Sequence, residues 1–231
     1  MATPARLARL AGALYLLVCV LGAAAHLGVR AGIHVDGDAV ATVQNLTANP
    51  TVFRLALVAD IAMATIFVFV GVTLHLLLRH VDRHAAGAMM VFVAVGAGMI
   101  LINLLLHQAA LLVATDPTYG APGSDGLVLL LLDLHAHGYA LAGIFFGLWL
   151  LPLGYLAHRS GLFPRSLGVL LVVAGGSWIV DTLVGFIAPD LPALAHTMLT
   201  APTIAEFWLV LYLLVKGVRT SAPERLDPLA V

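Results

Sequence analysis

Several carboxylate side chains interrupt the long apolar stretches of this sequence. Asp60, Asp181 and Glu206 each lie among aliphatic and aromatic residues. Burial of a charged side chain in an apolar environment costs several kcal/mol unless other groups satisfy it. A carboxyl group held at low dielectric can take up and release a proton, so these residues point to proton or cation binding.

A structural role for the same carboxylates is the alternative interpretation. Each could accept hydrogen bonds from neighbouring Ser, Thr or Trp side chains and so hold the helices together. Ser177 and Trp178 are the nearest candidate partners of Asp181.

Amide and imidazole side chains occur in the apolar segments as well. Asn103 and His107 are four residues apart, and so are Asp133 and His137, so each pair lies on one face of a helix. Pairs of this kind on neighbouring helices could orient imidazoles by hydrogen bonds. The predicted site for a ligand or a proton consists of Asp60, Asn103, His137, Asp181, Glu206 and His26.

A metal or haem site is a second interpretation of the histidines. His107, His137 and His196 are the candidate ligands, together with a carboxylate. The alternative is that they are interfacial histidines in contact with water. His135 and His137 are two residues apart, so a helix places them on nearly opposite sides and they are not a chelating pair.

The composition places these side chains in a lipid bilayer. Of the 231 residues, 61% are hydrophobic and only 10% are charged, compared with roughly a quarter in soluble domains. Six apolar segments, each long enough to cross roughly 30 Å of hydrocarbon, lie at about residues 8–29, 51–79, 85–113, 127–158, 165–188 and 193–217. They predict an all-α, polytopic bundle of six transmembrane helices. This single domain spans residues 1–220 and precedes a short cytoplasmic tail, 221–231. Cleavage of the first segment as a signal peptide is the alternative and would leave five spans.

The basic residues indicate the orientation of the bundle. Nine of the eleven Lys and Arg residues fall on one side of the predicted topology, leaving Arg30 and Arg54 for the other side. This asymmetry predicts that both termini are cytoplasmic. Counting helical rise places Glu206 about 15 Å from Lys216, near the midplane, and Asp60 about 30 Å from the nearest basic residue on that side. We therefore expect a polar chamber that opens to the non-cytoplasmic side, with Glu206 as its floor.

Other local patterns predict smaller features. The stretch between the first two segments is polar enough for a short surface helix ended by Asn49-Pro50. Segments that begin at Arg9, Arg83 and Arg165 resemble one another, which predicts three related helical hairpins.

Several classes of function are excluded or gain no support. The net charge of −1 gives no basic surface for nucleic acid. The single cysteine, Cys19, can form neither an intramolecular disulfide nor a thiolate metal cluster. The sequence has no phosphate-binding loop, dinucleotide fingerprint, HExxH motif or nucleophile elbow. Small residues at 94–98, 143–147 and 174–176 are typical of close helix packing and imply no chemistry.

Four stretches resemble a known family. They are RLAGALYLL near the start, FRLALVADI (53–61), HGYALAGIFFGLWLLPLGYLAHRSGLFPRSLGVLLVVAG (137–175) and AEFWLVLYLLVKGV (205–218). Together they resemble, over nearly the whole chain, the uncharacterised bacterial integral-membrane family catalogued as domain of unknown function 4386. The resemblance implies a multi-pass protein of the bacterial cytoplasmic (inner) membrane and transfers no activity or residue role.

Three classes of function remain open. The first is a transporter or receptor for a small molecule or proton, which we expect to form a homo-oligomer because six short spans make a small transporter. The second is an intramembrane enzyme acting on a lipid-like substrate, either with a metal or haem or by acid–base chemistry of the three carboxylates. The third is a non-catalytic membrane partner protein in which the polar residues only specify packing. The sequence requires no cofactor.

Overall fold

The structure is a computed structural model that describes residues 3–188 and 199–219. Its elements are α1 (Pro4–Ala23), the π-helix η1 (Ala24–Arg30), α2 (Ala31–Ile33), α3 (Ala39–Ala48), α4 (Pro50–Leu78), α5 (Arg83–Thr115), α6 (Asp125–Ser160), α7 (Arg165–Ile187) and α9 (Thr200–Val215). The described ranges contain no strand, so the predicted all-α class is confirmed. The predicted tail at 221–231 lies outside them.

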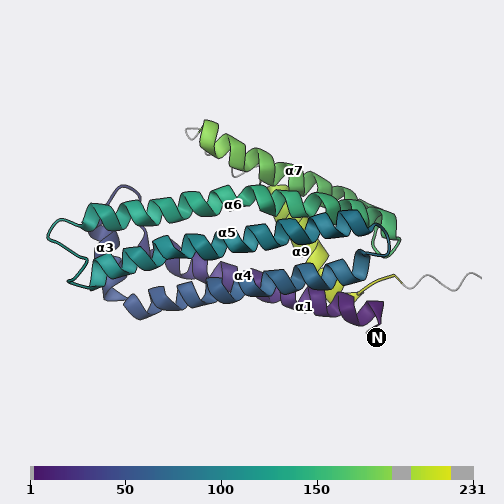
Figure 1. Ribbon diagram of the computed structural model, residues 1–231, viewed down its shortest axis with the longest axis horizontal. Helices are drawn as coiled ribbons and strands as arrows, with labels where there is room; N and C mark the ends of the chain where they lie inside the picture. The colour runs from purple at the N-terminus through teal and green to yellow at the C-terminus, as the bar shows by residue number, and fades with distance from the viewer. Residues whose placement is uncertain (1–2, 189–198, 220–231) are drawn as a thin grey trace, which may run out of the picture.

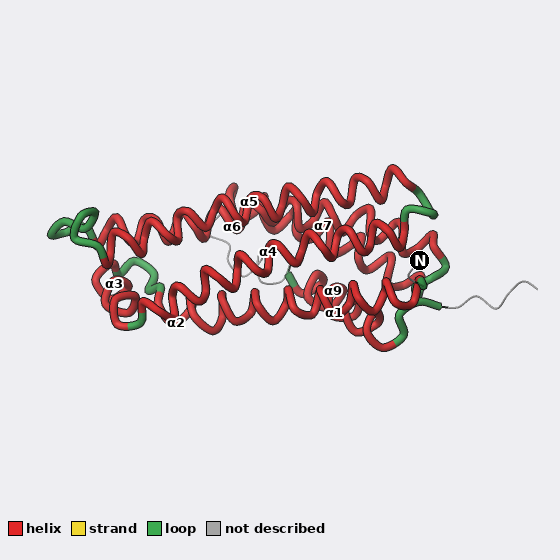
Figure 2. The backbone as a smooth tube through the Cα atoms, turned by 60° about the horizontal axis from the view of Figure 1, so that its bottom comes forward, coloured by secondary structure: helices red, strands yellow, loops and turns green. Residues whose placement is uncertain are grey.

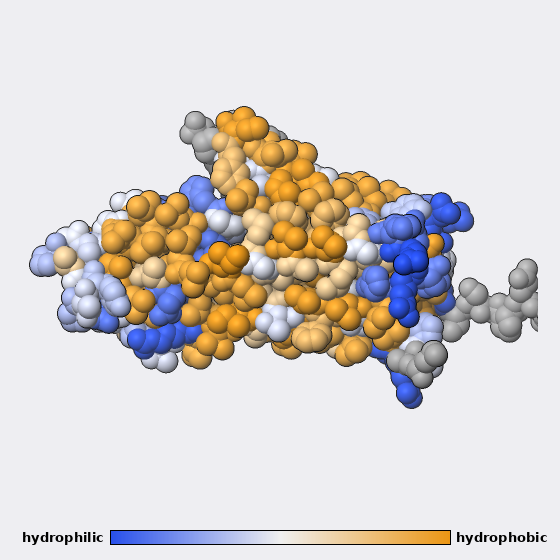
Figure 3. All heavy atoms as spheres, viewed as in Figure 1, coloured by the Kyte–Doolittle hydropathy of each residue, from blue (hydrophilic) through white to orange (hydrophobic). Residues whose placement is uncertain are grey.

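Five helical stretches are long and apolar enough to cross a membrane, by length and composition. They are the continuous stretch from α1 to α2, α4, α5, α6 and α7. The sixth apolar helix, α9, has only 16 residues, or about 24 Å at the α-helical rise. The predicted sixth segment, 193–217, begins outside the described residues. On the face shown in Figure 3, a broad hydrophobic region covers the middle of the molecule, with hydrophilic side chains at both ends. These features indicate a multi-pass membrane protein.

Local signals set where the helices begin and end. The Thr3 side chain accepts a hydrogen bond from a backbone N–H at the start of α1. Asp82 caps α5 by accepting the backbone N–H groups of Ala85 at 3.0 Å and His84 at 2.9 Å. These bonds, that from Ala85 first, hold the pKa of Asp82 below its usual range. Gly161, with φ of 68°, ends α6 in the left-handed conformation that glycine adopts without strain.

The predicted surface helix between the first two segments is confirmed as α3. Asp38 caps it by accepting the backbone N–H of Ala41 at 2.9 Å. Asn49 ends α3, and Pro50 is the first residue of α4, where its missing N–H costs nothing.

The helices α1, α4, α5 and α6 lie roughly parallel to the long axis of the molecule (Figure 2), whereas the shorter α9 crosses that axis steeply (Figure 1). One end, hereafter the basic end, holds the start of α1, the α4–α5 and α6–α7 turns and the end of α9 (Figure 1). The backbone N–H of Arg219 donates to the carbonyl of Leu162 at 2.9 Å, which joins the chain after α9 to the α6–α7 turn. The opposite end holds α3 and the α5–α6 loop (Figure 1). Arg6, Arg79, Arg83 and other basic residues therefore gather at one end of the bundle.

Two apolar clusters form the core, and a polar layer separates them. The larger cluster joins α1, α4, α5, α6, α7 and α9 toward the basic end. The smaller cluster consists of Ile33, Leu46, Phe53, Ala110, Leu111, Val128 and Leu132. Along α4, Asp60 lies between Phe53 of the smaller cluster and Met63 of the larger one. Asn103 and His107 occupy the same interval along α5, so the polar residues are stacked at one level.

Glycines bring α6 and α7 into close contact near the basic end. A methyl group at Gly147 would lie 2.5 Å from the carbonyl oxygen of Gly175, and one at Gly154 would lie 2.6 Å from that of Gly168. The predicted close packing at 143–147 and 174–176 is thereby confirmed. Farther along, α7 tilts away from α6 and ends well short of the start of α6 (Figure 1).

Candidate functional site

The π-helix η1 directs two side chains of the first span toward α4. Its i→i+5 hydrogen bonds form a wider turn than those of an α-helix, and such turns often occur at functional sites. His26 and Arg30 both lie in η1. The His26 Nε2 atom is 3.8 Å from Asp60 Oδ1, and Arg30 Nη2 donates to Asp60 Oδ2. Asp60 is fully buried, so the ion pair compensates its charge inside the bundle.

His107 completes the partners of this ion pair. Arg30 Nε donates to His107 Nδ1 at 3.4 Å, and His107 Nε2 lies 3.1 Å from the carbonyl oxygen of Phe53. A nitrogen that accepts from a guanidinium carries no proton, so Nε2 carries the proton and donates to the Phe53 carbonyl. The Phe53 ring stacks on the imidazole at 3.8 Å between centroids. These contacts define the neutral tautomer and the orientation of His107.

Asn103 and His135 join α5 to α6 at the same level. The Asn103 amide donates to the carbonyl oxygen of His135 at 2.7 Å, and His135 Nδ1 lies 3.2 Å from the Asn103 carbonyl oxygen. A methyl group at Gly138 would lie 2.2 Å from Asn103 Oδ1. Gly138 therefore makes room for the amide and does not break α6, which continues through it.

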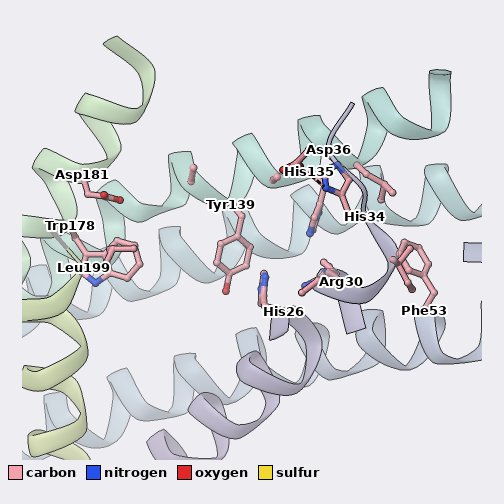
Figure 4. Close-up of a pocket in the computed structure, with 15 residues that line it drawn as sticks. His26, Arg30, His34, Asp36, Phe53, His135, Tyr139, Trp178, Asp181 and Leu199 are labelled. Carbon is pink, nitrogen blue, oxygen red and sulfur yellow. Dashed lines mark ion pairs between the residues drawn. The ribbon is translucent and has the colours of Figure 1, made fainter. Parts of the chain in front are cut away.

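A cavity of about 580 Å³ lies beside these groups. Figure 4 shows His26 and Arg30 from the first span and His135 and Tyr139 from α6 around it. The His26 ring meets the Tyr139 ring edge to face at 4.4 Å between centroids. Trp178 and Asp181, from α7, line the side of the cavity that is farther from Arg30 (Figure 4).

Four buried atoms of the polar layer have no hydrogen-bond partner among the described residues. They are His26 Nε2, Arg30 Nη1, Asp60 Oδ1 and His135 Nε2. Buried polar atoms in proteins are nearly always paired, with protein groups or with ordered water. The side chains of His26, Arg30 and His135, which carry three of these atoms, also line the larger cavity.

The wall of this cavity that lies opposite Trp178 is polar and partly exposed. His34, just after α2, places Nε2 2.8 Å from Asp133 Oδ1 of α6 and Nδ1 3.2 Å from Asp36 Oδ1. Asp36 is fully exposed. The imidazole thus links the loop before α3 to α6 at the solvent side of the cavity.

Glu206 lies in different surroundings from Asp60. Its carboxylate accepts hydrogen bonds from the Tyr15 hydroxyl and, at 3.1 Å, from the Trp178 indole N–H. These residues line a second cavity of about 210 Å³. Trp178, expected beside Asp181, therefore donates to Glu206. Glu206, expected to form the floor of a common chamber, lines this smaller cavity and is not among the residues that line the larger one.

Two other predicted site residues lie on the outer side of α6 and α7. His137 is exposed, and its Nδ1 lies 2.8 Å from the carbonyl oxygen of Asp133 on its own helix. His137 and Asp181 line a cleft between α6 and α7 together with Thr182 and Phe186. His135 is buried while His137 is exposed, which confirms that the two imidazoles point in different directions.

The proposed metal ligands are not gathered in the described structure. His107 lies in the Arg30 cluster, His137 lies on the exposed side of α6, and His196 falls outside the described residues. Within residues 3–188 and 199–219, no group of three or more His, Cys, Asp or Glu side chains could hold a metal ion.

The sequence interpretation missed three residues of this region. Arg30 was assigned to the outer side as a topological charge, although its spacing of four from His26 already placed both on one helix face. His135 was set aside in favour of His137. Tyr15 carried no signal, because a tyrosine in an apolar segment is usually a packing residue.

The comparisons with known proteins identify a family and no activity. The chain matches the family described as domain of unknown function (DUF4386) over residues 10–217. An "Uncharacterized protein" from Archaeoglobus fulgidus is 28% identical over 167 residues, which cover 72% of this chain and 87% of that protein. No solved structure matches the chain. Since the match spans most of its length, this chain belongs to the DUF4386 family.

Proposed function

We propose that this protein is a six-span protein of the bacterial cytoplasmic membrane, with both termini cytoplasmic, that binds a small solute from the non-cytoplasmic side as a receptor or transporter. The site is the larger cavity. His26, Arg30 and His135 bind the solute, Asp60 and His107 hold Arg30 in place, and Asn103 holds His135.

One observation carries this proposal: three side chains that line one cavity, those of His26, Arg30 and His135, each have a buried nitrogen without a hydrogen bond among the described residues. Arg30 Nη1 is a donor with no acceptor among the described residues, and each free imidazole nitrogen can donate or accept according to its tautomer. Asp60 balances the Arg30 charge, so the site offers hydrogen bonds without a large net charge. This pattern favours a small solute that carries hydrogen-bond acceptors.

The position of the two apolar clusters supports access from the non-cytoplasmic side. The larger cluster lies between the polar layer and the basic end, whereas the exposed Asp36 and half-buried His34 lie at the other side of the cavity. The gathering of basic residues at one end supports placing that end in the cytoplasm.

Cysteine labelling tests the direction of access. Ala136 lines the larger cavity and is exposed, and His84 is exposed at the basic end. In a Cys19→Ser background, the Ala136→Cys variant should react with a membrane-impermeant maleimide in right-side-out vesicles. The His84→Cys variant should react only in inside-out vesicles. Labelling of Ala136→Cys from the cytoplasmic side alone would refute the proposed access.

Thermal unfolding of the purified protein tests solute binding. Acetate, phosphate and glucose represent a carboxylate, a phosphate and an uncharged polyol. We expect at least one of them to raise the unfolding temperature saturably in wild type. His26→Phe keeps a ring beside Tyr139 but removes the nitrogens, so it should weaken that effect, whereas His84→Phe should not. Absence of any saturable effect from all three would contradict the proposal.

A further inference from the structure

The smaller cavity has walls of unusual composition. Residues of the larger apolar cluster form much of its lining, and its volume is about 210 Å³. Six of the seventeen aromatic residues of the chain line it: Tyr15, Phe67, Tyr139, Phe146, Trp149 and Trp178. Among the described residues that line it, Glu206 is the only Asp, Glu, Lys, Arg or His. The cavity is therefore an aromatic box with one carboxylate.

The carboxylate of Glu206 has hydrogen-bond donors but no counter-ion in the described structure. The Tyr15 hydroxyl is hydrogen-bonded to Oε2, and the Trp178 indole N–H donates to Oε1. Both donors are neutral, and no ion pair of Glu206 occurs within residues 3–188 and 199–219. When Glu206 is ionised, its charge in the apolar bundle requires compensation, so the cavity beside it is suited to a cation.

The aromatic walls decide which kind of cation fits. Phe67 meets Trp149 edge to face at 5.2 Å between centroids, and Phe146 meets Trp178 in the same way at 5.6 Å. Hard inorganic cations take roughly six oxygen ligands, whereas the side chains of the described lining offer oxygens only on Glu206, Tyr15 and Tyr139. An alkylammonium ion needs none, because ring faces and one carboxylate stabilise it, most strongly where water is excluded.

We propose that the smaller cavity binds a small organic ammonium ion, with Glu206 as its counter-charge and the aromatic rings as its cage. Tyr139 and Trp178 line both cavities, so these two rings form the boundary across which the ammonium ion reaches Glu206 from the larger cavity. The ammonium ion binds at Glu206, whereas the proposed solute binds at His26, Arg30 and His135, so binding at one site can fail while binding at the other is found.

Choline and its uncharged isostere 3,3-dimethylbutan-1-ol provide a matched test of the charge. Binding to wild type in a maltoside detergent, which has no ammonium group, is measured by calorimetry and thermal unfolding at constant ionic strength set with sodium chloride. We expect saturable binding of choline and binding of the isostere that is weaker by about tenfold or more. Glu206→Gln should reduce choline affinity by a similar factor, whereas Asp116→Asn, at the end of α5, should not change it.

A second measurement uses only the wild-type chain. Cys19, the single cysteine, lines the same cavity and is exposed, so occupancy of the cavity should slow its alkylation. Choline should protect Cys19 with the same concentration dependence as calorimetric binding. Equal binding of choline and the isostere, unchanged affinity in a folded Glu206→Gln variant, or absence of protection in wild type would each overturn the proposal.

Discussion

Arg30 of the first span and Asp60 of α4 form an ion pair whose carboxylate is completely buried. The pair lies in the polar layer between the two apolar clusters, where solvent screens charges weakly. Arg30 also donates to His107, so one guanidinium connects the first span to both α4 and α5. The ion pair thus has a structural role as well as the proposed role in solute binding.

Removal of one partner of this pair should destabilise the protein strongly. Asp60→Asn or Arg30→Gln leaves the other charge buried without a partner, and we expect each to lower the free energy of unfolding by about 3–5 kcal/mol. The double variant should cost less than the sum of the two single variants. Chemical unfolding in detergent measures these values. Arg54→Gln, at an exposed position, is the control, and single variants as stable as that control would contradict the prediction.

Gly138→Ala should disturb the contact between α5 and α6. The added methyl group would lie 2.2 Å from Asn103 Oδ1, so the amide must move away from the His135 carbonyl. We expect a loss of about 1–3 kcal/mol in stability. Gly176→Ala, where a methyl group meets nothing within 4 Å, is the matched control. Combining Gly138→Ala with Asn103→Ala should remove the clash, and a fully additive cost would show that the clash is not the cause.

Gly147→Ala should separate α6 from α7. A methyl group there would lie 2.5 Å from a backbone carbonyl, which cannot rotate away as a side chain can. We expect a cost of about 1–3 kcal/mol, measured by thermal unfolding in detergent. At Gly185, a methyl group meets nothing within 4 Å, and alanine favours a helix over glycine. Gly185→Ala should therefore be neutral or stabilising, and an equal loss at both positions would contradict the packing explanation.

Asp82 should make the start of α5 sensitive to acid. Its pKa is lower in the folded than in the unfolded protein because the Ala85 and His84 N–H groups stabilise the carboxylate. The stabilisation that ionised Asp82 gives the folded protein is therefore complete above the pKa that Asp82 has in the unfolded protein. It is lost as the pH falls through the pKa that Asp82 has in the folded protein. Asp82→Asn keeps a capping side chain without the charge. Wild type should be the more stable at about pH 6, and the difference should shrink below about pH 4.

Asp125→Asn is the control, because it removes a carboxylate from the first turn of α6, where no side chain makes a capping hydrogen bond. Thermal unfolding as a function of pH measures the difference for each variant. A difference between wild type and Asp82→Asn that stays constant from about pH 6 to below about pH 4 would exclude a contribution from ionisation.

The sequence alone determined the features that depend on composition and helical period. Long apolar runs with few charges can satisfy their backbone groups in a bilayer only as helices, so the helical class and five candidate spans were predictable. The Asn49-Pro50 stop, the close packing at the glycines and the different directions of His135 and His137 follow from local geometry in the same way.

Only the tertiary structure decided which polar groups meet. Helical period places a residue on a face but does not state which neighbour that face contacts or how far the helix is rotated. Arg30, which by sequence counts only as a basic residue of the non-cytoplasmic side, lies in the π-helix and pairs with the buried Asp60. Trp178 of α7 donates to Glu206 of α9 and Arg30 pairs with Asp60, so these two carboxylates, expected in one chamber, lie in separate surroundings. Hydrogen bonds and ion pairs act over a few ångströms, and only the packing of complete helices sets distances on that scale.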